Sequence, residues 1–383
     1  MTVTTPRGFS AAGIAAGIKK SGAADLALVF NHGPSAAAAA VFTSNRAQAN
    51  PILWSKQVIA DGVASAIILN SGGANCFTGP QGFQVTHRTA EAVGRALDIS
   101  AGDVLVCSTG LIGDQLDGDV LEAGANAVAK ALRPDGGDDA ARAIMTTDSV
   151  PKTTAVVRDG WSIGGMAKGA GMLAPGLATM LVVLTTDADL EPTQLDQALR
   201  AATRVSFDRL DSDGCMSTND QVTLLASGAS GITPELDSFT EALTEACLDL
   251  AQQLQRDAEG ASHDITIEVV NAVTEDDAVE VGRSLARNNL FKAAIFGNDA
   301  NWGRVLAAIG TTQAQFDPYL VDVSFNGVRL CHAGQPDRPR DEVDLTPRAT
   351  HVLIDLQAGS AAATVLTNDL THDYVHENSA YSS

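Results

Sequence analysis

The sequence has 383 residues, of which 45% are hydrophobic and 19% charged, and it carries a formal net charge of −21. A chain of this size and composition can bury the core of one large domain or two smaller ones. Its acidic balance argues against nucleic acid or an anionic membrane as a partner.

The cysteines and the N-terminal segment indicate the compartment. Cys76, Cys107, Cys215, Cys247 and Cys331 form no CxxC pair and are odd in number. This predicts neither a disulfide framework nor a zinc site, and it favours a reducing cytosol. The N-terminal segment lacks the basic stretch and apolar core of a signal peptide, and no apolar run approaches the roughly eighteen residues of a membrane span. We therefore expect a cytoplasmic protein.

Short strands alternate with helices in the first half of the chain. Apolar side chains fall on one helical face over 85–98, with Thr89 as the single polar member of that face. Residues 138–148 predict a helix that runs into a Thr-Thr-Asp turn, where the hydroxyl of Thr146 is typical of a turn cap. Apolar runs bounded by Gly, Pro or Asn predict the strands 25–30, 38–44, 65–70 and 103–109.

The strand at 103–109 ends in Ser-Thr-Gly, which places a hydroxyl and free backbone N–H groups at its tip. From the residue types alone, this is a plain junction between a strand and a turn.

The stretch 164–184 joins a glycine-rich segment, which contains Lys168 and ends at Pro175, to an apolar run. The glycines predict a flexible loop, and the continuous apolar residues 180–184 predict a strand buried on both faces. Thr179 stands at the junction. It is either an ordinary β-branched residue of a sheet or a hydroxyl that is held rigidly and faces a pocket.

The second half of the chain continues the mixed pattern. Residues 238–259 predict a long helix that begins with a capping box of Ser238 and Glu241 and ends at Gly260. Residues 208–214 are expected to form a solvated turn, because they match the calcium-loop pattern only in part. Further helices are predicted at 192–203 and 274–289, and further strands at 264–270, 319–325, 351–356 and 362–366.

Glu259 is expected on the last turn of the helix at 238–259, where the helix dipole disfavours a carboxylate. A charge in that place indicates a nearby cation. The cation is either the Lys or Arg of a salt bridge or the ammonium group of a bound substrate.

Several motifs span the chain from end to end. The central one is KGAGMLAPGLATM at 168–180. In their order along the chain, these motifs resemble the ornithine acetyltransferases (glutamate N-acetyltransferases) of arginine biosynthesis. The remaining motifs are PRGFSAAGIAAGIK at 6–19, NSGGAN at 70–75, CSTGLIG at 107–113, AIMTTDSVPK at 143–152, DAEG at 257–260, FGNDANWGRV at 296–305 and YVHENSAYSS at 374–383.

The resemblance implies a role for particular residues. The chain is expected to cut itself between Ala178 and Thr179, and the freed Thr179 is then the nucleophile. Thr109 and Gly110 correspond to the family's oxyanion hole. Substrate contacts are expected from Thr146, Lys168, Thr179, Glu259, Asn378 and Ser383.

The resemblance also implies a fold and a reaction. The fold is an α/β (α+β) arrangement of layered sheets covered by helices, similar to amino-terminal nucleophile hydrolases but with the family's own topology. The cut divides the chain into an α chain of 1–178 and a β chain of 179–383, assembled as two of each. The reaction is ping-pong transfer of the acetyl group of N-acetylornithine to glutamate, without a metal or bound cofactor and with acetyl-CoA as a further possible donor.

Three alternatives remain open from the sequence. The first is an amidohydrolase with the same N-terminal threonine and water as the acceptor. The second is a related acetyltransferase of a secondary-metabolite pathway. The third is a non-catalytic small-molecule-binding protein in which Thr179 is only a strand residue. One departure from the family, Ser262-His263 in place of its usual Thr-Lys, lies directly after the DAEG motif.

Overall fold

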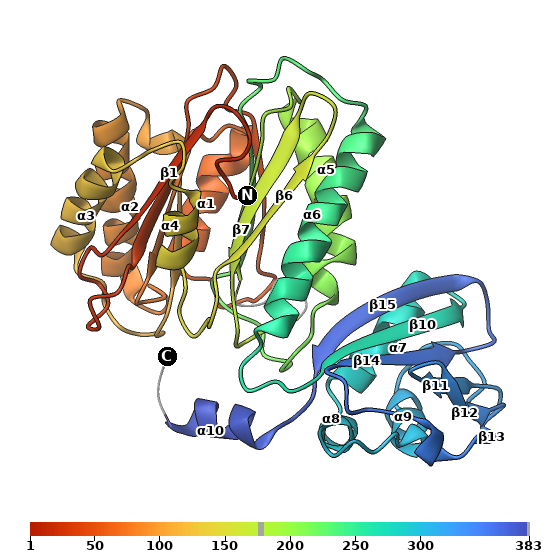
Figure 1. The fold of residues 1–383 in the computed structure, drawn as a ribbon. Helices are drawn as coiled ribbons and strands as arrows, with labels where there is room; N and C mark the ends of the chain where they lie inside the picture. The colour runs from red at the N-terminus through yellow and green to blue at the C-terminus, as the bar shows by residue number, and fades with distance from the viewer. Residues whose placement is uncertain (175–179, 381–383) are drawn as a thin grey trace.

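A computed structural model describes residues 1–174 and 180–380 (Figure 1). Within these residues the strands form three sheets, and helices cover their outer faces. The expected class of layered sheets covered by helices is confirmed. Ala178, Thr179 and Ser383 lie outside the described residues.

Two of the sheets pack face to face. Their shared core includes Val29 and Leu69 from one sheet and Met166 and Val183 from the other, all without exposed surface. The four-stranded sheet has the order β1 (Phe9–Ile14), β2 (Leu26–Asn31), β4 (Ala66–Ser71) and β5 (Val104–Thr109). The five-stranded sheet has the order β3 (Ala38–Phe42), β9 (Gln221–Ala226), β8 (Leu181–Thr186), β7 (Ser162–Lys168) and β6 (Lys152–Val157).

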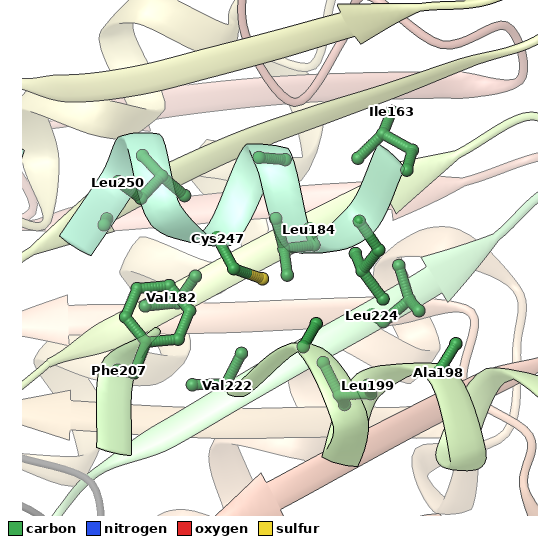
Figure 2. Close-up of a cluster of buried hydrophobic side chains, with 14 of the residues drawn as sticks. Ile163, Val182, Leu184, Ala198, Leu199, Phe207, Val222, Leu224, Cys247 and Leu250 are labelled. Atoms are coloured by element: carbon green, nitrogen blue, oxygen red, sulfur yellow. The ribbon is translucent and has the colours of Figure 1, made fainter. Parts of the chain in front are cut away.

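Helices complete four layers, which follow one another in Figure 1 as helices, sheet, sheet and helices. Figure 2 shows Leu199 of α5 and Cys247 of α6 beside Val182 and Leu184 of β8. Because β8 packs on helices with one face and on the other sheet with its opposite face, its run of apolar residues is continuous. The helices of this part are α1 (Asn50–Val58), α2 (Gly79–Leu97), α3 (Gly118–Lys130), α4 (Gly137–Ala143), α5 (Pro192–Val205) and α6 (Leu236–Arg256), with short 3₁₀ turns η1 (Ile59–Asp61), η2 (Ala101–Asp103) and η3 (Phe207–Arg209).

The remaining sheet has a separate core. Alternate residues of β10 (Asp264–Ala272), among them Ile265, Ile267 and Val269, are buried under helices. The sheet has the order β13 (Gln335–Pro336), β12 (Val328–His332), β11 (Asp322–Phe325), β14 (Ala349–Asp355), β10 and β15 (Ala361–Asn368). Its helices are α7 (Glu275–Ala286), α8 (Asn289–Phe296) and α9 (Trp302–Ile309), with the 3₁₀ turn η4 (Arg340–Glu342), and α10 (His372–Ala380) follows β15.

The glycine-rich segment is not a loop throughout, and that expectation is wrong for residues 164–168. These residues belong to β7, which pairs with both β6 and β8. A Cβ at Gly164 would lie 2.2 Å from the backbone oxygen of Thr2, and one at Gly165 would lie 2.9 Å from Cγ2 of Thr154. The two glycines therefore allow neighbouring chain to pack closely against the sheet.

The limits of α6 also differ from the expectation. The helix begins at Leu236, so Ser238 lies inside it and forms no capping box, and Glu235 is the N-cap. It ends at Arg256, which places Glu259 beyond the last turn. The backbone N–H of Glu259 donates to the carbonyl oxygen of Ala170 at 3.0 Å. Since that N–H bonds to another segment, the helix does not continue to this point.

The segment 208–214 differs from its expected form. Residues 208–214 are not a solvated turn, because Asp211 is fully buried and accepts a hydrogen bond from Nε of Arg287 at 2.7 Å. The polar segment around Trp302 is divided between a turn and α9. The side chain of Asn301 accepts a hydrogen bond from the backbone N–H of Arg304 and so caps this helix.

Candidate functional site

Most of the residues expected at the site line one pocket. The pocket lies where β5 and β7 end, beside the turn after α4, the segment after α6, and α10. Of the expected residues, Ala178, Thr179 and Ser383 are outside the described part of the chain. The residues lining the pocket are Thr109, Gly110, Thr146, Thr147, Lys168, Gly171, Met172, Glu259 and Asn378.

The NSGGAN motif holds the tip of β5. The backbone N–H groups of Gly72 and Gly73 donate to the carbonyl oxygen of Thr109 at 2.9 and 3.0 Å. Gly110 follows with a φ of +128°, and a Cβ on it would lie 2.6 Å from the nitrogen of Gly73. Glycine is therefore required at 110, and the side chain of Thr109 has a fixed place at the pocket wall.

Lys168 lies at the end of β7 with 1% of its surface exposed. Its Nζ donates to Oγ1 of Thr109 at 3.1 Å. Because the Thr109 oxygen accepts this bond, the hydrogen of its hydroxyl is free to donate to another acceptor. Burial lowers the pKa of Lys168, while the charge of Asp148 and, to a lesser extent, that of Asp220 act to raise it.

The carboxylate of Glu259 lies directly against Gly171 in the wall of the pocket. A Cβ on Gly171 would lie 2.6 Å from both carboxylate oxygens of Glu259, so only glycine leaves room for the carboxylate in this position. Nδ2 of Asn378 donates to Oε2 of Glu259 at 3.0 Å. Among residues 1–174 and 180–380, no lysine or arginine forms an ion pair with Glu259. This arrangement favours a ligand cation over an internal salt bridge.

The end of the chain is not frayed up to residue 380, because it forms α10 against the segment after α6. The hydroxyl of Thr371 donates to the carbonyl oxygen of Gly260 at 2.6 Å. A Cβ on Gly260 would lie 2.2 Å from the nitrogen of Tyr374. This close approach brings Asn378 to the pocket.

Two buried acids beside the pocket are not among the residues expected at the site. Oδ2 of Asp148 accepts a hydrogen bond from the backbone N–H of Thr146 at 3.0 Å, which is the local bond that a Thr-Thr-Asp turn could have indicated. Oδ1 of Asp220 accepts one from the N–H of Met180 at 3.0 Å. Burial raises the pKa of Asp220 well above its usual value. No signal in the sequence placed Asp220 at the start of β8.

No group of three or more His, Cys, Asp or Glu side chains within residues 1–174 and 180–380 could hold a metal ion. In the same ranges, no helix has the length and apolarity needed to cross a membrane.

Comparison with known proteins identifies relatives over the whole chain. The sequence profile of the ArgJ family matches residues 10–383. The "arginine biosynthesis bifunctional protein ArgJ" of Streptomyces coelicolor is 64% identical over the full length of both chains. The protein of that name from Mycobacterium tuberculosis is 55% identical over all of this chain and 96% of its own.

Solved structures include a chain of the ornithine acetyltransferase of Mycobacterium tuberculosis in complex with ornithine. It is 57% identical, has a TM-score of 0.45, and the match covers 47% of this chain and 96% of that one. The family profile and the full-length relatives lead to one conclusion. The chain belongs to the ArgJ family.

Proposed function

We propose that this protein transfers the acetyl group of N2-acetyl-L-ornithine to L-glutamate in arginine biosynthesis. Its full-length relatives carry the name of arginine biosynthesis proteins. The observation that carries the proposal is the bond from Lys168 to Thr109, inside a pocket that Glu259 and Asn378 also line. These residues lie far apart in the sequence, so their meeting is a product of the fold.

The proposed oxyanion hole consists of the Thr109 hydroxyl and the Gly110 N–H. The oxyanion of a tetrahedral intermediate needs donors that are in place before the reaction. The ammonium group of Lys168 donates to the Thr109 oxygen, which polarises the hydroxyl and leaves its hydrogen for the oxyanion. This supports acyl transfer over mere binding of a small molecule.

The proposed nucleophile is Thr179, freed by cleavage after Ala178. A threonine hydroxyl needs an adjacent base, and a free α-amine can serve as one. The hydroxyl attacks the acetyl carbonyl, the bond to the ornithine nitrogen breaks, and ornithine leaves with the proton. The amine of glutamate then attacks the acetyl-threonine ester and takes the acetyl group, so Thr179 is restored.

The charges of the pocket suit amino-acid substrates. Lys168 supplies a cation for a carboxylate, and Glu259 supplies an anion for the ammonium group of ornithine, with Thr146, Asn378 and Ser383 as further contacts. The relatives are called bifunctional, and we propose acetyl-CoA as the second acetyl donor. We further propose an assembly of two chains of 1–178 and two of 179–383.

A mass spectrum of the purified protein tests the proposal. It should show two fragments, 1–178 and 179–383, allowing for loss of Met1. After incubation with N-acetylornithine alone, the fragment that begins at Thr179 should gain the mass of one acetyl group. Glutamate should remove that mass and appear as N-acetylglutamate. Release of free acetate in place of N-acetylglutamate would indicate an amidohydrolase, and an uncut, fully active chain would contradict the mechanism.

A further inference from the structure

A buried cluster of charges lies behind the pocket, formed by Asp148, Lys152 and Asp257. The side chains of Asp148 and Lys152 have no exposed surface, and that of Asp257 is 9% exposed. Nζ of Lys152 donates to Oδ1 of Asp148 at 2.7 Å and to Oδ2 of Asp257 at 2.6 Å. None of the three lines the pocket. Buried charges are costly unless they are paired, so the cluster calls for an explanation.

Asp148 binds the two backbone segments that carry the pocket's polar residues. Its Oδ1 accepts from the backbone N–H of Gly169 at 2.6 Å, directly after Lys168. Its Oδ2 accepts from the N–H of Thr146 at 3.0 Å. One carboxylate thus fixes the turn that holds Thr146 to the end of β7.

Asp257 extends the cluster to the segment that carries Glu259. It lies directly after α6 and two residues before Glu259. Its carboxylate accepts from both the backbone N–H and the hydroxyl of Ser149, one residue beyond Asp148. Lys152 therefore joins the turn after α4 to the end of α6 through two charged hydrogen bonds, which are roughly twice as strong as neutral ones.

We propose that Asp148, Lys152 and Asp257 are positioning residues, which set the geometry of the pocket without touching substrate, and that Asp148 places the negative charge that faces the ammonium group of Lys168. This inference rests on the proposed acetyl transfer for its kinetic consequences. The placement of the charges it invokes does not depend on that reaction.

The charges around Lys168 predict the direction in which its pKa should change when a member of the cluster is replaced. Burial lowers its pKa, and Lys152 lowers it further, whereas Asp148, Asp220 and Glu259 raise it. Removing the negative charge at 148 must lower the pKa of Lys168, so the ammonium group loses its proton at a lower pH. Removing the positive charge at 152 must raise that pKa. A cluster that served only to stabilise the fold would leave the pH dependence of acetyl transfer unchanged.

The test compares Asp148→Asn and Lys152→Gln with a matched control, Asp187→Asn. Asp187 is also buried. Its carboxylate accepts hydrogen bonds from the backbone N–H of Ser162 at 2.7 Å and from that of Arg7 at 3.2 Å, and it pairs with the side chain of Arg7 at 3.3 Å. It lies at the opposite end of the five-stranded sheet, beyond β8.

The first measurement is the pKa of Lys168 in the full chain, followed by NMR of ¹³Cε-labelled lysine, with Lys168→Arg to assign the signal. We expect a downward shift in Asp148→Asn, an upward shift in Lys152→Gln and no shift in Asp187→Asn. Equal shifts in Asp148→Asn and the control would overturn the proposal. If Asp148→Asn does not fold, the test rests on Lys152→Gln alone. In that case a Lys168 pKa that is unchanged or lowered in Lys152→Gln overturns the proposal.

The second measurement is kcat/KM for acetyl transfer against pH. In Asp148→Asn the value should fall at least about tenfold, since small misplacement of binding groups is costly, and its alkaline limb should move to lower pH. The limb should move to higher pH in Lys152→Gln and stay in place in the control. A wild-type protein that transfers no acetyl group contradicts the proposed function, while the NMR result still decides the role of the cluster.

Discussion

At the scale of single residues, the hydroxyl of Thr109 has a defined direction. It accepts a hydrogen bond from Lys168, so its own hydrogen is left to donate. Thr109→Ala removes one proposed oxyanion donor and should lower kcat by about a hundredfold or more. Thr109→Ser keeps the hydroxyl and should retain most of the rate. Steady-state kinetics with N-acetylornithine and glutamate check both variants. If Thr109→Ala and the wild-type protein have equal kcat values, Thr109 is not part of the site.

Gly171 offers a second test at this scale, because it makes room for the Glu259 carboxylate. In Gly171→Ala the new Cβ would lie 2.6 Å from that carboxylate, which is the free end of a flexible side chain and can rotate away. We expect little loss of thermal stability but a fall in kcat/KM like that of Glu259→Gln, equivalent to about 1 to 3 kcal/mol of binding.

The double variant Gly171→Ala with Glu259→Gln provides the control for this test. Both changes act on the same carboxylate, so their effects should not add. Additive losses would show that Gly171 acts independently of Glu259.

At the scale of elements, the glycines of β7 serve packing. In Gly164→Ala the Cβ would lie 2.2 Å from the backbone oxygen of Thr2, which cannot move as a side chain can. Overpacking of this kind should lower the free energy of unfolding by about 1 to 3 kcal/mol. Gly303→Ala in α9 is the matched control, since no atom there would lie closer than 3.5 Å, and it should be neutral or stabilising. Denaturant unfolding of both variants decides the point.

Sequence patterns predicted the elements whose burial follows a simple period. The strands β2, β3, β4, β5 and β8 and most of helix α6 appear within a few residues of their expected places, whereas no strand was expected at β1, β6 or β9. Glycine content, however, does not reveal what lies beside each glycine, so it predicts a loop where the structure has the end of β7. The end of α6 was missed for a similar reason, because the N–H of Glu259 bonds to Ala170, a partner distant in sequence.

At the scale of the whole molecule, the pocket depends on the last helix of the chain. Deleting residues 378–383 removes Asn378 and its bond to Glu259. Self-cleavage should persist, because it requires only Thr179 and its immediate surroundings, whereas kcat/KM for N-acetylornithine should fall sharply. Full-length Asn378→Ala separates the loss of that one contact from the loss of the tail. A truncated protein that turns over like the full chain would contradict this role of the tail.

The meeting of these distant segments could not be derived from residue patterns. The motifs indicated which residues to consider only through resemblance to a family, and the roles of Thr109, Gly110, Thr146, Lys168, Glu259 and Asn378 stay predictions. Asp148 lies in the motif at 143–152 and Asp220 in none, and the resemblance assigned a role to neither. Their importance depends on burial and on backbone donors from other segments, which periodicity does not report.

The position of β8 determines what a chain cut after Ala178 can do. In the five-stranded sheet this strand lies between β7, from before the cut, and β9, from after it. Each fragment would then hold an incomplete sheet and half of a shared interior. Dilution alone should not part the fragments, and neither should complete the five-stranded sheet in isolation. For such a protein, separation of the two fragments and loss of the native state are a single thermodynamic transition. The cut in the backbone would therefore not make the assembly less stable against separation.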